Sequence, residues 1–592
     1  MDQRLELDPY ATAIVGRNDS GKTSLLNRFF DQYVYEHAVH SGDRPLVEGP
    51  GDRHVGFTLL WDIDLSDYSV FPFPVAFQPP ARRRFEVTFQ HFDGPSEDWI
   101  YRLDGQRLAI YSDRSPDTGW PVLRDEFNLR QLIPRPHYVS VSRTSASMFE
   151  MHLFALADGW VRSIPHAKPD DPARLLLAVG GMNAITRPVT GIEELWPQLP
   201  HTRRSEHTLE QVESQLALLS ERLTTKMQRW WNDPPGLRVS VRLAGNADSK
   251  RRQHHINSYI VVRDISGTHG PGYSGEGILW FLSFLVELLF LEDQPSPLLL
   301  LFDEPGSPLH PSAQRAVAKL LTVLAQKHQV IYSTHSPFMI DWNFPQRIRL
   351  FRRDADTGRT TIDNTPYAGK GAHRVWDPLR DTLGVSLGDI GVIGEHNILV
   401  EGIADQLLLA NASAQLEALG RSHLDLAQVA IVPFGSDLVI LRGLLNTAKR
   451  LGATACILAD SDSSGNGFVK EGLKQRVDGL QVAAYVDPVS KDASIEDMVG
   501  TTEYVVAVNE AYSGFDWFRP FDPTTIQAAC GTLSLGSYFE REFSSRFDQN
   551  FSKVSVALLL IGRPTFEEPT LARFEALIGG MLGAMQRGNR SQ

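Results

Sequence analysis

The sequence predicts an α/β protein of two domains, the second of which is organised around a mostly parallel sheet. In the first part of the chain, an apolar run at 11–15 leads into a glycine-rich loop, and a second apolar run at 298–302 ends in Asp303 and Glu304. In the last part, strand-like and helix-like segments alternate from Asn397 onward. Such alternation is typical of parallel strands joined by right-handed crossovers.

Length and composition fit a multidomain protein without a membrane anchor. The chain has 592 residues, more than one hydrophobic core usually serves, so about two to four domains are expected. The N-terminus shows no secretory signal, and the longest apolar stretch, at 278–291, is too short to cross a bilayer. Two cysteines offer neither a disulfide framework nor a CxxC metal site. We therefore expect a cytoplasmic protein without membrane partners.

The net charge of −13 argues against a protein that simply coats nucleic acid, because such proteins are basic. It does not argue against a nuclease, because a nuclease gathers carboxylates to hold metal ions. Basic clusters occur at 82–84, 203–204 and 250–252. Solvated surface is the simpler interpretation of each cluster taken alone.

The glycine-rich loop at 16–23 matches the phosphate-binding pattern GxxxxGK[ST]. A strand precedes it and a helix is expected to follow, so backbone N–H groups would cradle phosphates. Lys22 would reach the β and γ phosphates, and Thr23 would hold Mg²⁺. The residues expected at this nucleotide site are Asn18, Ser20, Gly21, Lys22, Thr23 and Ser24.

An acidic pair corroborates the nucleotide site. Asp303 and Glu304 directly follow the apolar run at 298–302, where unpaired charges are costly to bury. Asp303 is expected to bind Mg²⁺ through water, and Glu304 to polarise the attacking water. An exposed turn over 303–308 is the alternative, but it leaves the position of the charge pair unexplained.

Acidic residues also gather where the strands of the last part end. In open α/β sheets the carboxyl ends of the strands form the binding crevice, and carboxylates that meet there repel one another unless cations neutralise them. Two divalent ions could then bind the attacking and leaving oxygens of phosphodiester hydrolysis. Helix caps and turns are the alternative for each acid alone. The acids are Glu401, Asp405, Asp460, Asp462 and Glu496.

Lys553 lies downstream in an apolar segment. It would either stabilise negative charge on the scissile phosphate or serve as an ordinary lysine at the edge of a buried element. The sequence leaves these two interpretations open.

Two further motifs resemble the ATP-binding cassette (ABC) class of ATPases. His335, in STHSP, occupies a position similar to that of the switch histidine, which senses the γ-phosphate. The segment YSGEG, with Ser274 and Gly275, resembles a degenerate ABC signature, whose usual second glycine and glutamine are replaced by Glu276 and Gly277. The resemblance implies that ATP closes a head-to-tail dimer.

The ordered set EGxxD (401–405), PFG (433–435) and DSD (460–462) resembles the TOPRIM nuclease domain. An ABC ATPase with a helical arm and a C-terminal TOPRIM domain resembles the OLD family of ATP-dependent endonucleases, to which the nuclease of the Gabija anti-phage system belongs. The resemblance implies an ATPase domain at 1–385 with an inserted arm at about 150–235, and a Rossmann-like TOPRIM domain at 390–592.

The resemblance also implies an activity: DNA cleavage under nucleotide control in phage defence. ATP and Mg²⁺, or Mn²⁺ at the nuclease site, are the expected cofactors. The metal would be held by Glu401, Asp405, Asp460, Asp462 and Glu496, with assistance from Lys553. The implied partners are DNA, further copies that form a dimer or tetramer through the ATPase, and a second defence protein.

Two other functions remain open from the sequence. The same carboxylates would serve cleavage of RNA, including tRNA, once the ATPase senses an invader. A DNA-clamping ATPase of recombination and repair, with a TOPRIM domain that does not cut, is the third hypothesis. The full acidic set argues against this last hypothesis, because binding alone does not require it.

Overall fold

The structure is a computed structural model. It describes residues 5–26 (with gaps), the strands between 55 and 140, and residues 206–231, 236–247, 254–288 (with gaps), 298–354, 358–367, 394–470 (with gaps), 481–484 and 492–588 (with gaps).

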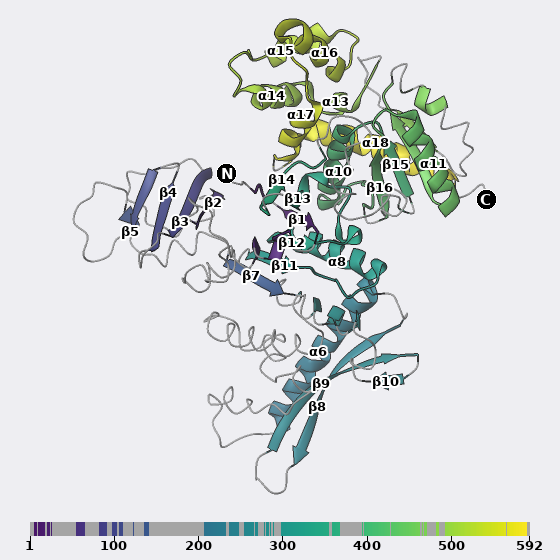
Figure 1. The fold of residues 1–592 in the computed structure, drawn as a ribbon. Helices are drawn as coiled ribbons and strands as arrows, with labels where there is room; N and C mark the ends of the chain where they lie inside the picture. The colour runs from purple at the N-terminus through teal and green to yellow at the C-terminus, as the bar shows by residue number, and fades with distance from the viewer. Residues whose placement is uncertain are drawn as a thin grey trace.

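The first half of the chain is organised around a six-stranded sheet (Figure 1). All neighbouring strands pair in parallel except the edge strand β14, which is antiparallel to β13. The strands, in spatial order, are β14 (Thr360–Asp363), β13 (Ile348–Arg353), β1 (Ala11–Gly16), β12 (Gln329–Thr334), β11 (Leu298–Asp303) and β7 (Arg135–Ser140).

The central strands are mostly apolar and almost fully buried, as expected where both faces of the sheet are covered. All six residues of β1 are buried, and β11 and β12 each bury all but their first residue. Ile14, Leu301 and Ile331 belong to a cluster on one face, and the larger core covers the other. Near-continuous apolar runs are typical of parallel strands covered on both faces. Helix α8 (Pro311–Leu324) joins β11 to β12.

Two further parts belong to the first half. Strands β2 to β6, between Val55 and Leu123, form a five-stranded sheet. Helix α6 (Glu206–Trp230) packs along a ribbon of β8 (Arg238–Ala247), β9 (His254–Asp264) and β10 (Gly267–His269). Figure 1 shows this helix and ribbon extending from the central sheet as an arm, on the side opposite the C-terminal half.

The second half begins with a four-stranded, fully parallel sheet in the order β16-β15-β17-β18. Its strands are β15 (His396–Val400), β16 (Val429–Pro433), β17 (Thr454–Ala459) and β18 (Gln481–Ala484). Helix α10 (Ile403–Ala418) follows β15, and α11 (Leu438–Leu451) follows β16. Asp437 caps the start of α11, and Gly452 ends it with a positive φ of 67°.

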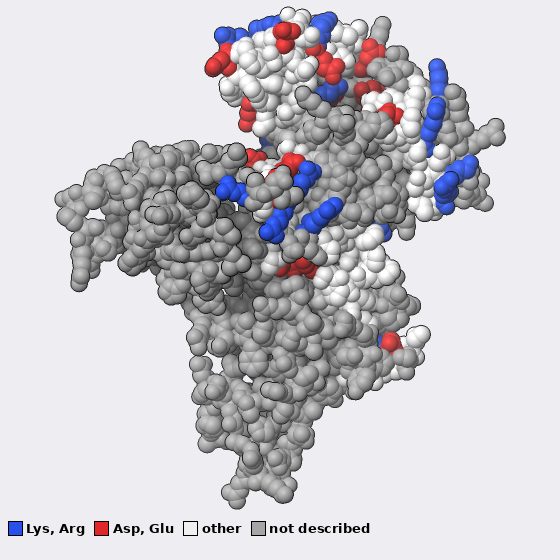
Figure 2. Space-filling view, in the orientation of Figure 1, with Lys and Arg blue, Asp and Glu red and all other residues white. Residues whose placement is uncertain are grey.

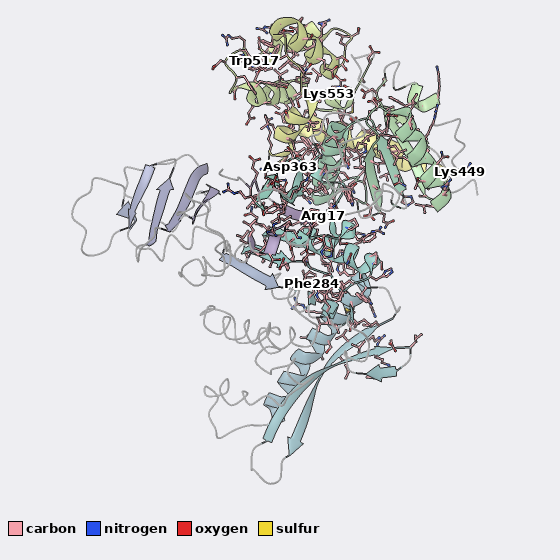
Figure 3. All side chains as sticks on the ribbon, in the orientation of Figure 1. Arg17, Phe284, Asp363, Lys449, Trp517 and Lys553 are labelled. Atoms are coloured by element: carbon pink, nitrogen blue, oxygen red, sulfur yellow. The ribbon has the colours of Figure 1, made fainter. Side chains whose placement is uncertain are left out.

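Helices complete the C-terminal half. They are α13 (Ile495–Met498), α14 (Thr501–Tyr512), α15 (Pro523–Cys530), α16 (Leu535–Glu542), the π-helix η7 (Phe543–Phe547), α17 (Lys553–Ile561) and α18 (Glu568–Gly588). An aromatic cluster around Phe543 joins α14, η7 and the loops that carry Trp517 and Phe551; Trp517 and Lys553 are labelled in Figure 3. Figure 2 shows acidic and basic side chains mixed over the described part of this half.

The predicted α/β class and its strands are confirmed. The strands predicted at the apolar runs 11–15 and 298–302 and at NILVEG (397–402) are observed as β1, β11 and β15. Helix α6 lies within the arm predicted at about 150–235, whereas residues 150–205 of that arm lie outside the described residues. So does the domain boundary predicted at 385–390. Among the helices that the structure describes, none is long and apolar enough to span a membrane.

Candidate functional site

The first candidate site lies at the carboxyl ends of β1, β11 and β12. Lys22 begins the helix after the phosphate loop, and its side chain is only 4% exposed. Its ammonium group donates to the carbonyl oxygens of Gly16 (2.8 Å) and Arg17 (3.0 Å) and lies 3.3 Å from Glu304 Oε1. A buried cation requires such partners. The carbonyl oxygens of the loop therefore hold the Lys22 side chain against the loop.

A hydroxyl-carboxylate cluster adjoins the loop. Thr23 Oγ1 and Ser333 Oγ donate to the same atom, Asp303 Oδ1, at 3.0 and 2.6 Å. The backbone N–H of Glu304 donates to Ser333 Oγ at 2.8 Å. Asp303 is 1% exposed, so its charge is stabilised by these short bonds. Hydroxyl and carboxylate oxygens are the hard ligands that Mg²⁺ prefers, and Thr23 with Asp303 fits that ion.

Glu304 and His335 form a close pair across the ends of β11 and β12. His335 Nδ1 lies 2.7 Å from Glu304 Oε2, and the His335 backbone N–H donates to the same oxygen at 3.3 Å. Burial favours a neutral Glu304, but the hydrogen bond and charge of His335 and the nearby Lys22 ammonium hold its pKa below the usual value. The hydrogen bond to Glu304 likewise raises the pKa of His335. Glu304 is therefore kept as a carboxylate, the form that accepts a proton.

The structure describes only some of the other residues expected at this site. Gly21 has a φ of 90°, which favours glycine, and a Cβ there would lie 3.0 Å from Thr360 Oγ1. The hydroxyl of Ser20 is buried and has no hydrogen-bond partner among the described residues. Four expected residues, Asn18, Ser24, Ser274 and Gly275, lie outside the described residues.

Sequence reasoning missed two residues of this site. Ser333 is the first residue of the segment STHSP, and a small hydroxyl at the end of an apolar strand was a usable signal. Thr360 on β14 donates its hydroxyl to the carbonyl oxygen of Ser20 at 2.9 Å and so fixes the loop from the sheet edge. Nothing in the sequence around Thr360 indicates that contact.

The second candidate site lies at the carboxyl ends of β15 and β17. Glu401 Oε1 accepts a hydrogen bond from the Asp460 backbone N–H at 3.0 Å, which joins the two strand ends. Asp405, 7% exposed, accepts from the Gly402 N–H at 3.0 Å. Burial, together with the charges of Asp405, Glu401 and Glu496, raises the pKa of Asp460 to about 9. The acids are therefore near enough to repel one another.

Glu496 and Lys553 complete this group from the C-terminal helices. Glu496, on α13, is 1% exposed and accepts from Ser494 Oγ at 2.6 Å. Its other oxygen, Oε1, lies 3.7 Å from Lys553 Nζ and has no hydrogen-bond partner within the described part of the chain. Lys553 is the first residue of α17 and also lies 3.4 Å from Glu540. The charge of Glu496 is the main cause of a raised pKa at Lys553.

The donor set suits a hard divalent cation, although it is incomplete in the described residues. Asp462 lies outside them, and within them no group of three or more His, Cys, Asp or Glu side chains is arranged to hold a metal ion. Two observations favour a cation: burial and the neighbouring carboxylates together raise the pKa of Asp460, and the buried Oε1 of Glu496 has no hydrogen-bond donor among the described residues. Carboxylate oxygens are the preferred ligands of Mg²⁺ and Mn²⁺.

Part of the chain matches a family model. Residues 239–341 match the family described as "AAA domain, putative AbiEii toxin, Type IV TA system". The matched segment contains the acidic pair at 303–304, His335 and most of the arm ribbon. The family match therefore covers the second part of the ATP site, without the phosphate loop.

Two curated proteins are similar over short stretches. The OLD nuclease of Thermus scotoductus is 32% identical over 129 residues, which are 20% of this chain and 23% of that protein. An uncharacterised protein of Methanocaldococcus jannaschii is 29% identical over 119 residues, 19% of this chain and 30% of the relative. The chain thus spans less than a third of the length of each of these relatives.

Solved structures of SMC heads also match. The SMC head bound to the C-winged helix domain of ScpA has 13% sequence identity and a TM-score of 0.34, with 61% of this chain and 91% of that chain covered. The SMC head domain from Thermotoga maritima has 12% identity and a TM-score of 0.29, with 61% and 92% covered.

Proposed function

We propose that the chain is an ATP-regulated, divalent-metal-dependent DNA endonuclease of the OLD family that serves in anti-phage defence, a proposal supported by the partial similarity to an OLD nuclease and by the match to an AAA domain. The observation that carries the nuclease assignment is the crowding of Glu401, Asp405 and Glu496 around Asp460 at the ends of parallel strands. Such crowding is unfavourable for an apoprotein and favourable once cations are bound.

In the ATP site, each side chain has one expected task. Lys22 would exchange its loop carbonyl partners for the β and γ phosphates, and Thr23 and Asp303 would hold Mg²⁺. Glu304 would accept a proton from the attacking water, which requires the carboxylate form that His335 and Lys22 maintain. His335 would sense the γ-phosphate through its contact with Glu304. Ser274 and Gly275 would complete the site of a second copy in a dimer.

In the nuclease site, Glu401, Asp405, Asp460, Asp462 and Glu496 would hold the metal. When bound, divalent metal supplies a polarised water and neutralises charge on the scissile phosphate. Asp460 would remain ionised because the cation offsets the repulsion of its neighbours. Lys553 is held near Glu496 and would place its ammonium against a non-bridging oxygen of the phosphate.

The test of this proposal is cleavage by the purified protein. Supercoiled plasmid and total tRNA would be incubated with Mg²⁺ or Mn²⁺, with and without ATP. We expect metal-dependent plasmid cutting that Asp460→Ala abolishes while ATP hydrolysis continues, because Asp460 belongs to the second site alone. The double variant Asp460→Ala, Asp462→Ala is the stricter control.

Three outcomes would contradict the proposal. Cutting of tRNA with intact plasmid would favour the RNA effector. Unchanged biological activity of the Asp460→Ala, Asp462→Ala variant would favour the DNA clamp. Loss of ATP hydrolysis in Asp460→Ala with cutting retained would show that the two sites are assigned the wrong way round.

A separate experiment tests the defence role. Cells that carry the wild-type protein should be protected against phage, and cells that carry Asp460→Ala should lose that protection.

A further inference from the structure

A short segment connects the ATP site to the second half of the chain. We call residues 335–343 the sensor segment, because it starts at His335 and runs through the 3₁₀-helix η5 (Pro337–Met339). Next to His335, Ser336 Oγ donates to Gln314 Oε1 at 2.6 Å. Gln314 Nε2 in turn donates to the carbonyl oxygen of Gly306, in the loop after β11, at 3.0 Å. The segment therefore starts fixed to the acidic loop of the ATP site.

The segment ends at Asn343, which contacts β16, the edge strand of the second sheet. Asn343 is 6% exposed, and its Nδ2 donates to the carbonyl oxygens of Leu426 (3.2 Å) and Val429 (2.9 Å). Its Oδ1 accepts from the Ile431 N–H at 2.8 Å. Because β16 is the outer strand of its sheet, one side of its backbone needs other partners. Asn343 supplies them, so it holds β16 as a neighbouring strand would.

A second amide side chain secures the same junction from α10. Gln406 Nε2 donates to the carbonyl oxygens of Trp342 and Ile431, both at 2.7 Å. Its Oε1 is buried with no hydrogen-bond partner among the described residues, so the amide is held there at a cost in stability. Gln406 directly follows Asp405, one of the acids of the second site.

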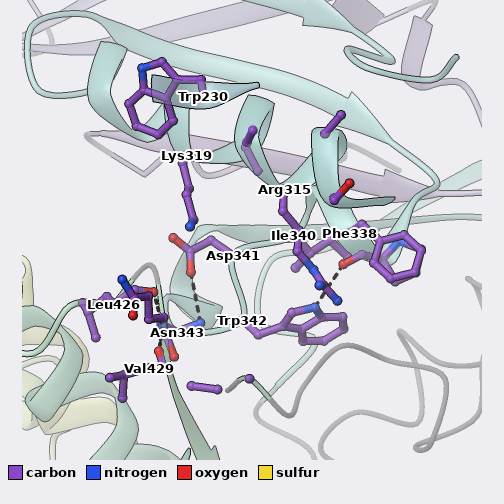
Figure 4. Close-up of a pocket in the computed structure, with 18 of the residues that line it drawn as sticks. Trp230, Arg315, Lys319, Phe338, Ile340, Asp341, Trp342, Asn343, Leu426 and Val429 are labelled. Carbon is purple, nitrogen blue, oxygen red and sulfur yellow. Dashed lines mark hydrogen bonds between the residues drawn. The ribbon is translucent and has the colours of Figure 1, made fainter. Parts of the chain in front are cut away.

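Trp342 makes the segment rigid. Its Nε1 donates to the carbonyl oxygen of Pro337 at 3.1 Å, which ties the two ends of the segment together. Its ring packs against the large hydrophobic cluster that both halves share and against the smaller cluster of the C-terminal half. Figure 4 shows Asp341 and Asn343 between Lys319 and the chain around Val429, with Trp342 beside them below Arg315. These residues line part of an open cavity of about 880 Å³.

A shift of β16 would reach the nuclease carboxylates through two backbone bonds. The strand ends at Pro433, and the N–H of Phe434 donates to the carbonyl oxygen of Val400 at 2.9 Å. The N–H of Ser436 donates to the carbonyl oxygen of Glu401 at 3.2 Å. The turn after β16 is therefore bonded directly to the residue whose side chain contacts Asp460.

We propose that Asn343 and Gln406 are positioning residues through which the nucleotide at the first site sets the geometry of Glu401 and Asp405. The proposal rests on the proposed function, because it assumes that nucleotide and cleavage are coupled. A nucleotide that draws His335 toward its γ-phosphate moves the start of the sensor segment. The rigid segment transmits that movement to β16 through Asn343 and to α10 through Gln406.

The variant that tests the proposal is Asn343→Ala, with Asn509→Ala as its matched control. Asn509 makes the same kind of two-way contact, with the carbonyl oxygen and the N–H of Phe521 at 2.8 Å each, but within the C-terminal helices. Trp342→Phe is the milder second variant, because it removes the bond to Pro337 and retains an aromatic ring and the backbone carbonyl that Gln406 binds.

Two measurements separate this proposal from the proposed function. The first is hydrogen exchange of the backbone amides at 401–406 and 429–436, with and without a non-hydrolysable ATP analogue. The second is the ratio of cleavage rates with and without ATP. A ligand at one site typically changes the affinity of a linked site by about 5- to 150-fold. In Asn343→Ala, the fold-difference between the two cleavage rates, in whichever direction ATP acts, should be below about twofold while ATP hydrolysis persists. Trp342→Phe should lower the ratio in the same direction.

The outcomes are distinct. A nucleotide-dependent change in exchange that is lost in Asn343→Ala and kept in Asn509→Ala supports the proposal, even if the wild-type protein cuts nothing and the proposed function fails. Cleavage by the wild type with no nucleotide effect on these amides overturns the proposal and leaves the nuclease assignment intact. Equal responses of Asn343→Ala and Asn509→Ala would also overturn it.

Discussion

Glu304 combines an unusual backbone with a defined protonation state. Its φ of 50° places it in the left-handed region, directly after the buried strand β11. Non-glycine residues rarely adopt this region, and they are often found at functional sites when they do. The conformation directs its carboxylate to His335 and Lys22 together. The backbone conformation and the side-chain contacts thus together fix the position of the Glu304 carboxylate.

We predict that Glu304→Gln binds ATP but hydrolyses it about 10²- to 10⁴-fold more slowly, the usual range when a general base is lost. Glutamine retains the shape and a hydrogen-bond acceptor for His335, and it cannot take a proton from water. The measurements are ATP turnover and nucleotide-induced thermal stabilisation, which should persist because binding is retained. A variant that turns over ATP at the wild-type rate would remove Glu304 from this role.

At the scale of elements, the second site depends on a close approach between helices. Gly536, near the start of α16, lies where a Cβ would come within 2.7 Å of Glu496 Oε2 and 2.9 Å of Lys553 Nζ. Contacts this short force a neighbour to move. The absence of a side chain at Gly536 therefore lets α16 pack against both charged groups.

We predict that Gly536→Ala lowers metal-dependent cleavage at least about tenfold, since displacements on the order of 1 Å in positioned groups have large effects on rate. Its stability should fall by about 1–3 kcal/mol, as for other overpacked sites. ATP hydrolysis is expected to stay unchanged. Gly443→Ala in α11 is the control, because a Cβ there meets nothing within 4 Å. Equal cleavage by both variants would contradict the prediction.

Strands were predictable where the local sequence contains a continuous apolar run. The apolar runs that became β1, β11 and β15 are local signals, and residues at their carboxyl ends are necessarily brought to one edge of a sheet. For this reason Lys22 and Asp303 could be assigned to one place from the local pattern, whereas His335 was assigned there by its resemblance to the switch histidine of ABC ATPases. Their chemical roles remain predictions.

Contacts between distant segments had no such signal. Thr360 bonds Ser20 across most of the ATPase, and Asn343 bonds β16 from another sheet. A lone threonine or asparagine in a polar connection looks like any turn residue. Lys553 was left between two interpretations because its ion pair with Glu496 depends on how α13 and α17 pack. Such pairs follow from tertiary structure.

At the scale of the whole molecule, the two halves share one hydrophobic core. The largest cluster contains Val15 and Tyr332 of the central sheet and Leu407, Val429 and Phe543 of the C-terminal half. The bonds of Asn343 and Gln406 cross the same junction. The described halves are therefore expected to lose their structure together.

We predict that an ATP analogue with Mg²⁺ raises the unfolding temperature of both halves, although it binds only the first. A ligand at 100 times its Kd stabilises the folded state by about 2.7 kcal/mol, and a shared core distributes that stabilisation over the whole cooperative unit. The measurement is thermal unfolding followed by brief proteolysis and identification of fragments from each half. Coupled halves become cleavable at the same temperature and shift together when nucleotide is added. A C-terminal half that is cleaved first, at a temperature that nucleotide does not change, would show that the shared core does not couple the two halves, and ATP control of cleavage would then have to act through a path other than the core.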